Sequence, residues 1–179
     1  MIDGSKLPVA ENIALTHRVV DIARPHGVSV EGEVGVVGYV SGAASAMTSP
    51  EEAHLFDVES GADALAISIG NVHLSTEKNS GIDFSALRLV EATTHLPLVL
   101  HGGSGIPVEV RRRLALETRV KKFNIGTELR MAFGAALRRA VAERPDCFDR
   151  IELLRETIPA VRAEARRVIS TLWPDTGSG

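Results

Sequence analysis

The chain has 179 residues, a formal net charge of −3 and a pI of about 6.1. This balance gives no sign of a nucleic-acid or membrane partner, and the apolar stretches are too short and too often broken by charge to span a membrane. The start of the chain lacks a secretory signal pattern, and the single cysteine is typical of a reducing cytoplasm, the expected location. The length fits one domain, residues 1–179.

Short apolar segments alternate with amphipathic ones along the chain. Strands are expected at 1–3 (the tail of a strand), 28–33, 62–69, 97–101 and 122–125, and helices at 8–24, 49–60, 83–94, 107–117 and 127–143. Apolar residues at helical spacing predict one further long helix from 149 to 172. Five strand–helix units indicate an α/β protein with a parallel sheet covered by helices.

One segment combines an apolar strand, a histidine and a glycine-rich turn. Residues 98–100 end at His101, which is followed by Gly102, Gly103 and Ser104, and Pro107 then opens a helix. The imidazole thus lies at the carboxyl end of a strand, where α/β folds place their chemistry. Glycine lets backbone N–H groups approach an anion closely. This loop is therefore predicted to hold a metal or proton-transfer ligand together with a phosphate.

A barrel explains this arrangement better than a dinucleotide-binding fold, because no Gly-x-Gly-x-x-Gly element follows the first strand. In (β/α)₈ barrels, phosphate binds at the loops after the last two strands, which here are 102–104 and 126–127. Such barrels have about 250 residues. We therefore expect a partial TIM (β/α)₈ barrel, comprising roughly its last five strand–helix units and a long C-terminal helix.

Five motifs in order carry a resemblance to a known family. They are Met1-Ile2-Asp3-Gly4-Ser5 with Glu11-Asn12-Ile13, the segment 27–33, Ile69-Gly70-Asn71-Val72-His73, Leu100-His101-Gly102-Gly103-Ser104-Gly105, and Asn124-Ile125-Gly126-Thr127-Glu128-Leu129-Arg130. Over nearly its whole length the chain resembles class II, zinc-dependent fructose- and tagatose-bisphosphate aldolases. It resembles a member that lacks the N-terminal third.

The resemblance implies a Zn²⁺ ion that polarises the substrate ketone, with His73 and His101 as two of its three ligands. It places Glu33, and less directly Asp3 and Glu31, beside the metal or as alternative ligands. Because Glu31 and Glu33 are two residues apart on a strand, their carboxylates face the same way. The resemblance also implies a monovalent cation, although Leu74 stands where many members of the family have glycine.

The resemblance further assigns the phosphate site and one substrate contact. Phosphate would be bound by Gly102, Gly103 and Ser104 on one loop and by Gly126 and Thr127 at the start of the next helix, while Asn124 would contact the substrate. Purely structural interpretations stay open. His73 could be a loop residue, and His101 could be a packed imidazole at a strand end. Asn124 could be a helix cap, and the three acids named above could be polar residues of the barrel interior.

The chain also departs from the family pattern. The family's general acid–base aspartate and first zinc histidine form an Asp-His pair, and no such pair occurs in this sequence. The general acid–base residue is therefore unassigned. The expected reaction is reversible cleavage of a ketose 1,6-bisphosphate to dihydroxyacetone phosphate and glyceraldehyde 3-phosphate. Activity is expected to be impaired in this chain.

Substrate, assembly and even catalysis stay open at this stage. Fructose 1,6-bisphosphate is the first expected substrate and tagatose 1,6-bisphosphate the second, with a third carbonyl phosphate as a further option. A homo-oligomer is expected if the full barrel is present. One alternative is a non-catalytic phosphosugar-binding half-barrel, or a fragment completed by a partner. Another is a metal-free phosphate-binding barrel enzyme such as an isomerase.

Overall fold

A computed structural model of the protein describes residues 1–38, 45–71 and 81–172. Its centre is a parallel four-stranded sheet in the order β1-β2-β3-β4. The strands are β1 (Glu31–Val34), β2 (Ala64–Ile67), β3 (Leu98–Leu100) and β4 (Val120–Phe123). The α-helices are α1 (Val9–Ala23), α2 (Pro50–Ser60), α3 (Phe84–Thr93), α4 (Val108–Glu117), α5 (Thr127–Glu143), α6 (Arg150–Arg155) and α7 (Thr157–Leu172), and two 3₁₀ turns are η1 (Arg24–His26) and η2 (Gly103–Gly105). The α/β class is confirmed.

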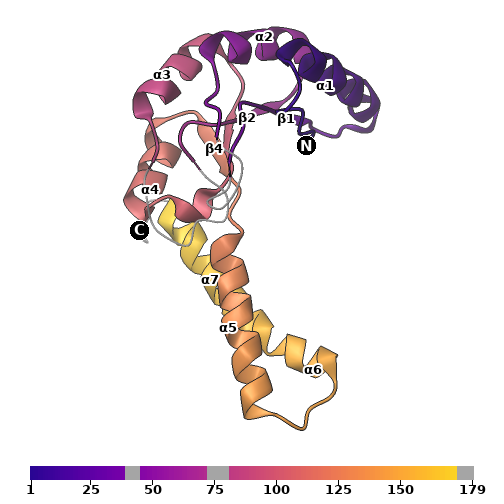
Figure 1. Cartoon of the computed structure of the whole chain (residues 1–179), viewed down its shortest axis with the longest axis vertical. Coiled ribbons are helices and arrows are strands. Elements are labelled where there is room, and N and C mark those ends of the chain that lie inside the picture. Colours follow the sequence, from indigo (N-terminus) through magenta and orange to yellow (C-terminus); the bar gives the residue numbers. More distant parts are fainter. Residues whose placement is uncertain (39–44, 72–80, 173–179) are drawn as a thin grey trace, which may run out of the picture.

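Helices α1, α2, α3 and α4 follow one another in an arc along one side of the sheet (Figure 1). Between this arc and the sheet lies the apolar core. Its buried members come from both layers: Val34, Leu65, Ile67, Leu98, Leu100 and Val120 from the strands, and Ala53, Phe56, Leu87, Val90 and Leu114 from the helices. Since side chains alternate along a strand, the residues between these face the opposite, concave side of the sheet.

The register decides which residues share the concave side. Glu33 pairs with Ala66, and Ala66 pairs with Val99, so these three side chains point the same way. The register shifts between β3 and β4: Leu98 pairs with Val120, but the next residue, Val99, pairs with Lys122. An extra residue in one strand re-aims the side chains that follow it, and here it turns Lys122 toward the concave side.

Helices α2 and α3 begin with side-chain caps. The hydroxyl of Ser49 accepts the N–H of Glu52 at the start of α2, and Asp83 accepts the N–H groups of Ser85 and Ala86 at the start of α3. Such caps satisfy backbone donors that lack an intrahelical acceptor. The helix start predicted at Ser49 is confirmed.

The segment after α5 differs from the single long helix predicted for 149–172. It forms α6 and α7, which are separated at Glu156. Proline has no N–H to donate, and its ring clashes with the carbonyl four residues before it. For Pro159 that carbonyl belongs to Arg155, the last residue of α6, so the helix ends there and restarts with proline in its first turn.

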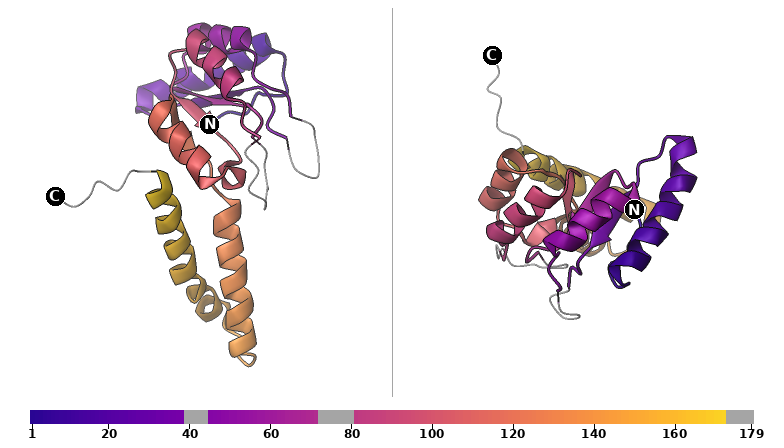
Figure 2. Two further views of the ribbon diagram at one scale, coloured as in Figure 1. Left: turned by 90° about the vertical axis from the view of Figure 1, so that its left-hand side faces the viewer. Right: turned by 90° about the horizontal axis from the view of Figure 1, so that it is seen from above.

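Helices α5 and α7 lie side by side and extend away from the sheet as an arm, with α6 at its far end (Figures 1 and 2). The arm carries exposed apolar residues, among them Met131, Ile151, Ile158 and Phe148, which is 98% exposed. In the part of the chain that the structure describes, no helix is both long and apolar enough to cross a membrane.

The first predicted strand is absent, so the sheet has four strands where five were expected. Only the N–H of Ile2 reaches β1, where it donates to the carbonyl of Glu31 (2.8 Å). The chain then turns, because the side chain of Asp3 accepts the N–H and hydroxyl of Ser5. This turn ends the pairing after a single hydrogen bond.

Candidate functional site

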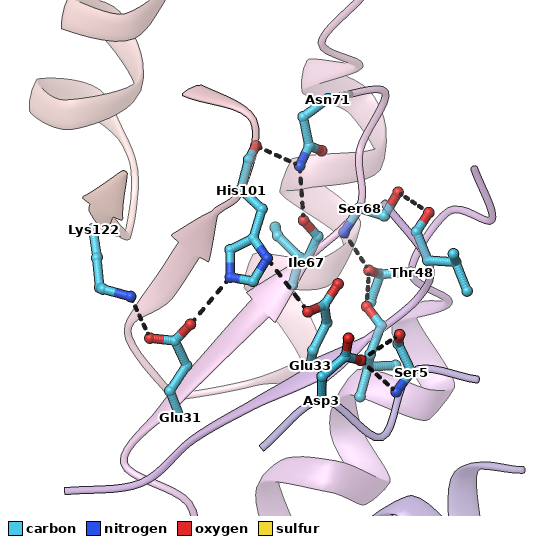
Figure 3. A network of polar contacts seen from close by, with 12 residues as sticks. Asp3, Ser5, Glu31, Glu33, Thr48, Ile67, Ser68, Asn71, His101 and Lys122 are labelled. Atoms are coloured by element: carbon cyan, nitrogen blue, oxygen red, sulfur yellow. Dashed lines mark hydrogen bonds and ion pairs between the residues drawn. The ribbon is translucent and has the colours of Figure 1, made fainter. Parts of the chain in front are cut away.

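The imidazole of His101 lies between two glutamates of β1 (Figure 3). Its Nε2 is 3.2 Å from Oε1 of Glu31, and its Nδ1 is 3.4 Å from Oε2 of Glu33. Both glutamates project from the concave side of the sheet, and His101 directly follows β3. The predicted shared orientation of Glu31 and Glu33 is confirmed. His101 and Glu33 are 5% and 4% exposed, so both are shielded from water.

Lys122 adds a cation to this cluster. Its Nζ donates to Oε2 of Glu31 at 2.6 Å. Burial raises the pKa of Glu31, but hydrogen bonds from Lys122 and His101 outweigh burial and leave that pKa below its ordinary value. Glu31 is therefore held as a carboxylate. Sequence reasoning missed Lys122, because a lysine in a strand gives no signal of its partner.

The pKa of Glu33 is shifted in the opposite direction. Burial, and next the negative charges of Asp3 and Glu31, raise the pKa of Glu33 to about 7. Asp3 lies beside Glu33 in Figure 3 but is itself exposed, and the hydroxyl and N–H of Ser5 lower its pKa. The predicted acids Asp3, Glu31 and Glu33 are thus gathered in one place, where a proton or another cation would relieve their repulsion.

Asn71 fixes the backbone at His101. Its Nδ2 donates to the carbonyls of His101 (3.0 Å) and Ile67 (3.3 Å), and its Oδ1 accepts the N–H of Ile69 (2.8 Å). Asn71 is 3% exposed. These bonds tie the end of β2 to the end of β3, so the buried amide holds the histidine in place. The motif at 69–73 contained Asn71, but sequence reasoning gave this residue no role.

The glycine-rich turn lies directly after His101. Gly102 has a φ of 67°, which favours glycine, and η2 follows it. The N–H of Gly103 donates to the carbonyl of Asn124 (3.0 Å), and the hydroxyl of Ser104 accepts the N–H of Glu128 (3.3 Å). The N–H of Gly103 is therefore used to join the turn to the end of β4. This differs from the expectation that it faces a phosphate.

The start of α5 lies against this turn. Gly126 is the residue before the helix, and the hydroxyl of Thr127 accepts a hydrogen bond from Arg130 (3.3 Å). Asn124 is half-buried, and its N–H donates to the carbonyl of Leu100 (2.9 Å). The turn 102–104 and the helix start at 126–127 are thus adjacent, as the barrel hypothesis predicted. A helix N-terminus provides backbone N–H groups and a positive dipole end for an anion.

The chemistry of the donor set fits Zn²⁺ in part. A neutral imidazole has one N–H, so it can donate to only one of Glu31 and Glu33, and the other carboxylate faces a ring lone pair. A cation held by that nitrogen, with the opposite N–H on a carboxylate, is the usual arrangement of a metal-binding histidine. However, within residues 1–38, 45–71 and 81–172 no three His, Cys, Asp or Glu side chains are placed so that they could hold one metal ion together. His73 lies outside the described residues.

Comparison with known proteins decides the family. The chain matches the model of the fructose-bisphosphate aldolase class-II family over residues 1–175. The chain belongs to this family. The resemblance predicted from the five motifs is confirmed.

The relatives are aldolases. The chain is 40% identical over 172 residues to a 6-phospho-5-dehydro-2-deoxy-D-gluconate aldolase of Shouchella clausii, covering 94% of this chain and 58% of that protein. The crystal structure of the YdjI aldolase from Escherichia coli is 32% identical, with a TM-score of 0.71 over 100% of this chain and 61% of that one. Fructose-bisphosphate aldolase of Campylobacter jejuni, 20% identical with a TM-score of 0.70, covers 95% of this chain and 59% of that one and supports the fold alone. The chain thus spans about three fifths of the length of these relatives.

Proposed function

We propose that this protein cleaves a phosphorylated keto substrate by a metal-dependent retro-aldol reaction. One observation carries the proposal: His101, set between Glu31 and Glu33, directly precedes the turn 102–104, which lies against the start of α5. This arrangement puts a candidate metal ligand and a candidate anion site at one end of the sheet. The family match over residues 1–175 supports the same reaction class.

In this proposal His101 and His73 hold Zn²⁺, and Glu33, Glu31 and Asp3 lie close to it. When bound, Zn²⁺ supplies Lewis-acid polarisation of the substrate ketone. One glutamate accepts the imidazole N–H and so fixes which ring nitrogen is available. Ser104, Thr127 and the backbone N–H groups of Gly102 and Gly126 bind the phosphate, while the N–H of Gly103 joins the turn to the carbonyl of Asn124. Asn124 contacts the substrate beside the ketone. A monovalent cation near the phosphate belongs to the same proposal.

The substrate class follows from chemistry that three candidates share. Fructose 1,6-bisphosphate, tagatose 1,6-bisphosphate and 6-phospho-5-dehydro-2-deoxy-D-gluconate each carry a ketone next to a phosphorylated carbon. Retro-aldol cleavage of each releases dihydroxyacetone phosphate. The third candidate comes from the name of the 40%-identical relative and joins the two bisphosphates expected from the sequence. The second product separates them, because it is glyceraldehyde 3-phosphate for the bisphosphates and an aldehyde acid for the gluconate derivative.

The proposed reaction also needs a proton-transfer group. The sequence contains no adjacent Asp-His pair, so we propose that catalysis by these 179 residues alone is weak. A phosphosugar-binding protein without catalysis is the second candidate, and the complete turn and helix start favour it.

We further propose a cytoplasmic location, since the chain has one cysteine. Homo-oligomers formed through the arm would cover its exposed apolar residues, and light scattering would measure their size.

One experiment separates catalysis from binding alone. Each of the three substrates is incubated with the chain plus ZnCl₂, and with the chain plus EDTA, while dihydroxyacetone phosphate is measured. Release of this product that EDTA abolishes supports the aldolase and identifies its substrate. Substrate binding without product in either condition supports the second candidate. Equal release with ZnCl₂ and EDTA contradicts the metal-dependent reaction.

A further inference from the structure

A buried arginine lies behind the candidate phosphate turn. Arg111, on α4, is 0% exposed. Its two terminal nitrogens donate to the two carboxylate oxygens of Glu128, at 3.0 and 3.3 Å. Among the described residues, its Nε has no hydrogen-bond partner. Two parallel charge-assisted hydrogen bonds fix the relative orientation of both side chains.

Glu128 connects Arg111 to the turn. It is the second residue of α5, so its N–H has no acceptor within the helix, and this N–H donates to the hydroxyl of Ser104 (3.3 Å). Its carboxylate also accepts from Arg167 of α7 (3.1 Å), which Glu164 holds in turn. Glu128 therefore contacts the turn, α4 and the arm at once.

Stability alone does not require such a pair. Replacement of a buried ion pair by apolar side chains is frequently neutral or stabilising, whereas removal of one partner leaves an uncompensated charge. The geometry offers a different role for the pair. Fixing the carboxylate of Glu128 also fixes its backbone N–H, and that N–H sets the position of the hydroxyl of Ser104.

We propose that Arg111 is a positioning residue for phosphate binding: it clamps Glu128, which holds Ser104 and the start of α5 together. This inference rests on the proposed function, which assigns phosphate to Ser104 and Thr127. Arg167 supports the same carboxylate from the arm, but its side chain is 47% exposed, so solvent weakens its contribution. The effect of Arg111 should therefore exceed that of Arg167.

The test compares Arg111→Met with Arg112→Met, because Arg112 is an exposed neighbour on the same helix. Two readouts are measured on the folded chain: hydrogen exchange at the N–H of residue 128, and affinity for inorganic phosphate. Arg111→Met should speed exchange and weaken phosphate binding, each about tenfold. Arg111→Lys should recover little, since lysine cannot form two parallel bonds. Arg112→Met should change neither readout.

Arg111→Met could fail to fold, because it removes two charge-assisted hydrogen bonds from the largely buried carboxylate of Glu128. The double variant Arg111→Met/Glu128→Gln removes that charge and keeps the proposal falsifiable. A positioning role predicts that this double variant folds and still binds phosphate weakly. Phosphate affinity equal to that of the unaltered chain, with unchanged exchange at residue 128, would overturn it.

Ser104→Ala distinguishes failure of the inference from failure of the proposed function. If Ser104→Ala weakens phosphate binding and Arg111→Met does not, only the positioning role is wrong. If the unaltered chain binds no phosphate, the proposed phosphate site is wrong, and so is the positioning role assigned to Arg111. Hydrogen exchange at residue 128 then still reports whether Arg111 holds this segment in place.

Discussion

The Nζ atom of Lys122 lies 2.6 Å from Oε2 of Glu31, although these residues belong to the two outermost strands, β4 and β1. Outer strands of a flat four-stranded sheet would be about 14 Å apart, and side chains perpendicular to it would not meet. The sheet therefore curves around its concave side. This curvature also brings His101, at the end of β3, within 3.2 Å of Glu31 (Figure 3).

Lys122→Met should raise the pKa of Glu31, because it removes the strongest hydrogen bond that offsets burial. Since the folded-state pKa of Glu31 is lowered, its contribution to stability is present above pH 4.5 and is lost as pH falls through the folded value. A ¹³C NMR titration of the glutamate carboxyls measures the shift. Lys121→Met is the control, because Lys121 contacts the carbonyl of Thr118 and should leave Glu31 unchanged.

In metal-free protein, Glu33 should make stability depend on pH in the direction opposite to that given by Glu31. Its pKa is raised from 4.5 to about 7, so its unfavourable contribution grows as pH rises through this interval. Glu33→Gln should therefore be stabilised relative to the unaltered chain at pH 8, by about 1–2 kcal/mol after solvent screening, but not at pH 4. Urea unfolding at both pH values, with EDTA present, measures the difference. A stability difference independent of pH would contradict a raised pKa.

Asn71→Leu should be strongly destabilising. It leaves the N–H of Ile69 and the carbonyls of Ile67 and His101 without their side-chain partner in a buried site. The expected loss of unfolding free energy is about 2–4 kcal/mol. Asn71→Asp is the matched variant, since it keeps the acceptor for Ile69 and loses both donated bonds. Thermal unfolding without a change in midpoint would show that Asn71 does not hold the two strand ends together.

Two glycine substitutions should change stability in opposite directions. A Cβ at Gly32 would lie 2.2 Å from the ring of Phe56, so Gly32→Ala should cost about 1–3 kcal/mol through overpacking. Gly134 lies inside α5, where an added Cβ meets only the end of Arg138 at 3.3 Å. Gly134→Ala should stabilise by about 0.5–1 kcal/mol, because alanine favours a helix. Chemical denaturation checks both, and Phe56→Leu should relieve the Gly32→Ala strain.

The elements that sequence predicted best are those with local signals. The cap at Ser49 and Pro50 and the alternation of strands with helices depend on neighbouring residues alone, and both are confirmed. The missing first strand and the break before α7 depend on less obvious local chemistry. The side chain of Asp3 turns the chain at Ser5, and Pro159 removes a helix hydrogen bond.

The site was predictable where a residue ends a strand or shares its face. His101 with Glu31 and Glu33 follows from strand alternation, and the turn at 102–104 follows from its glycines. Lys122 was not predictable, because its direction depends on a register shift between β3 and β4. Asn71 and Arg111 act through contacts distant in sequence, with His101 and Glu128, which only the folded chain brings together.

If His101 belongs to a metal centre, its removal must lower the affinity of the chain for zinc. Calorimetric titration of the metal-free chain with ZnCl₂ compares the unaltered protein with His101→Ala and His54→Ala. His54 lies on α2, where its Nδ1 contacts the carbonyl of Thr93. We expect His101→Ala to weaken zinc binding by at least about tenfold and His54→Ala to leave it unchanged. Equal affinity in all three proteins would contradict it.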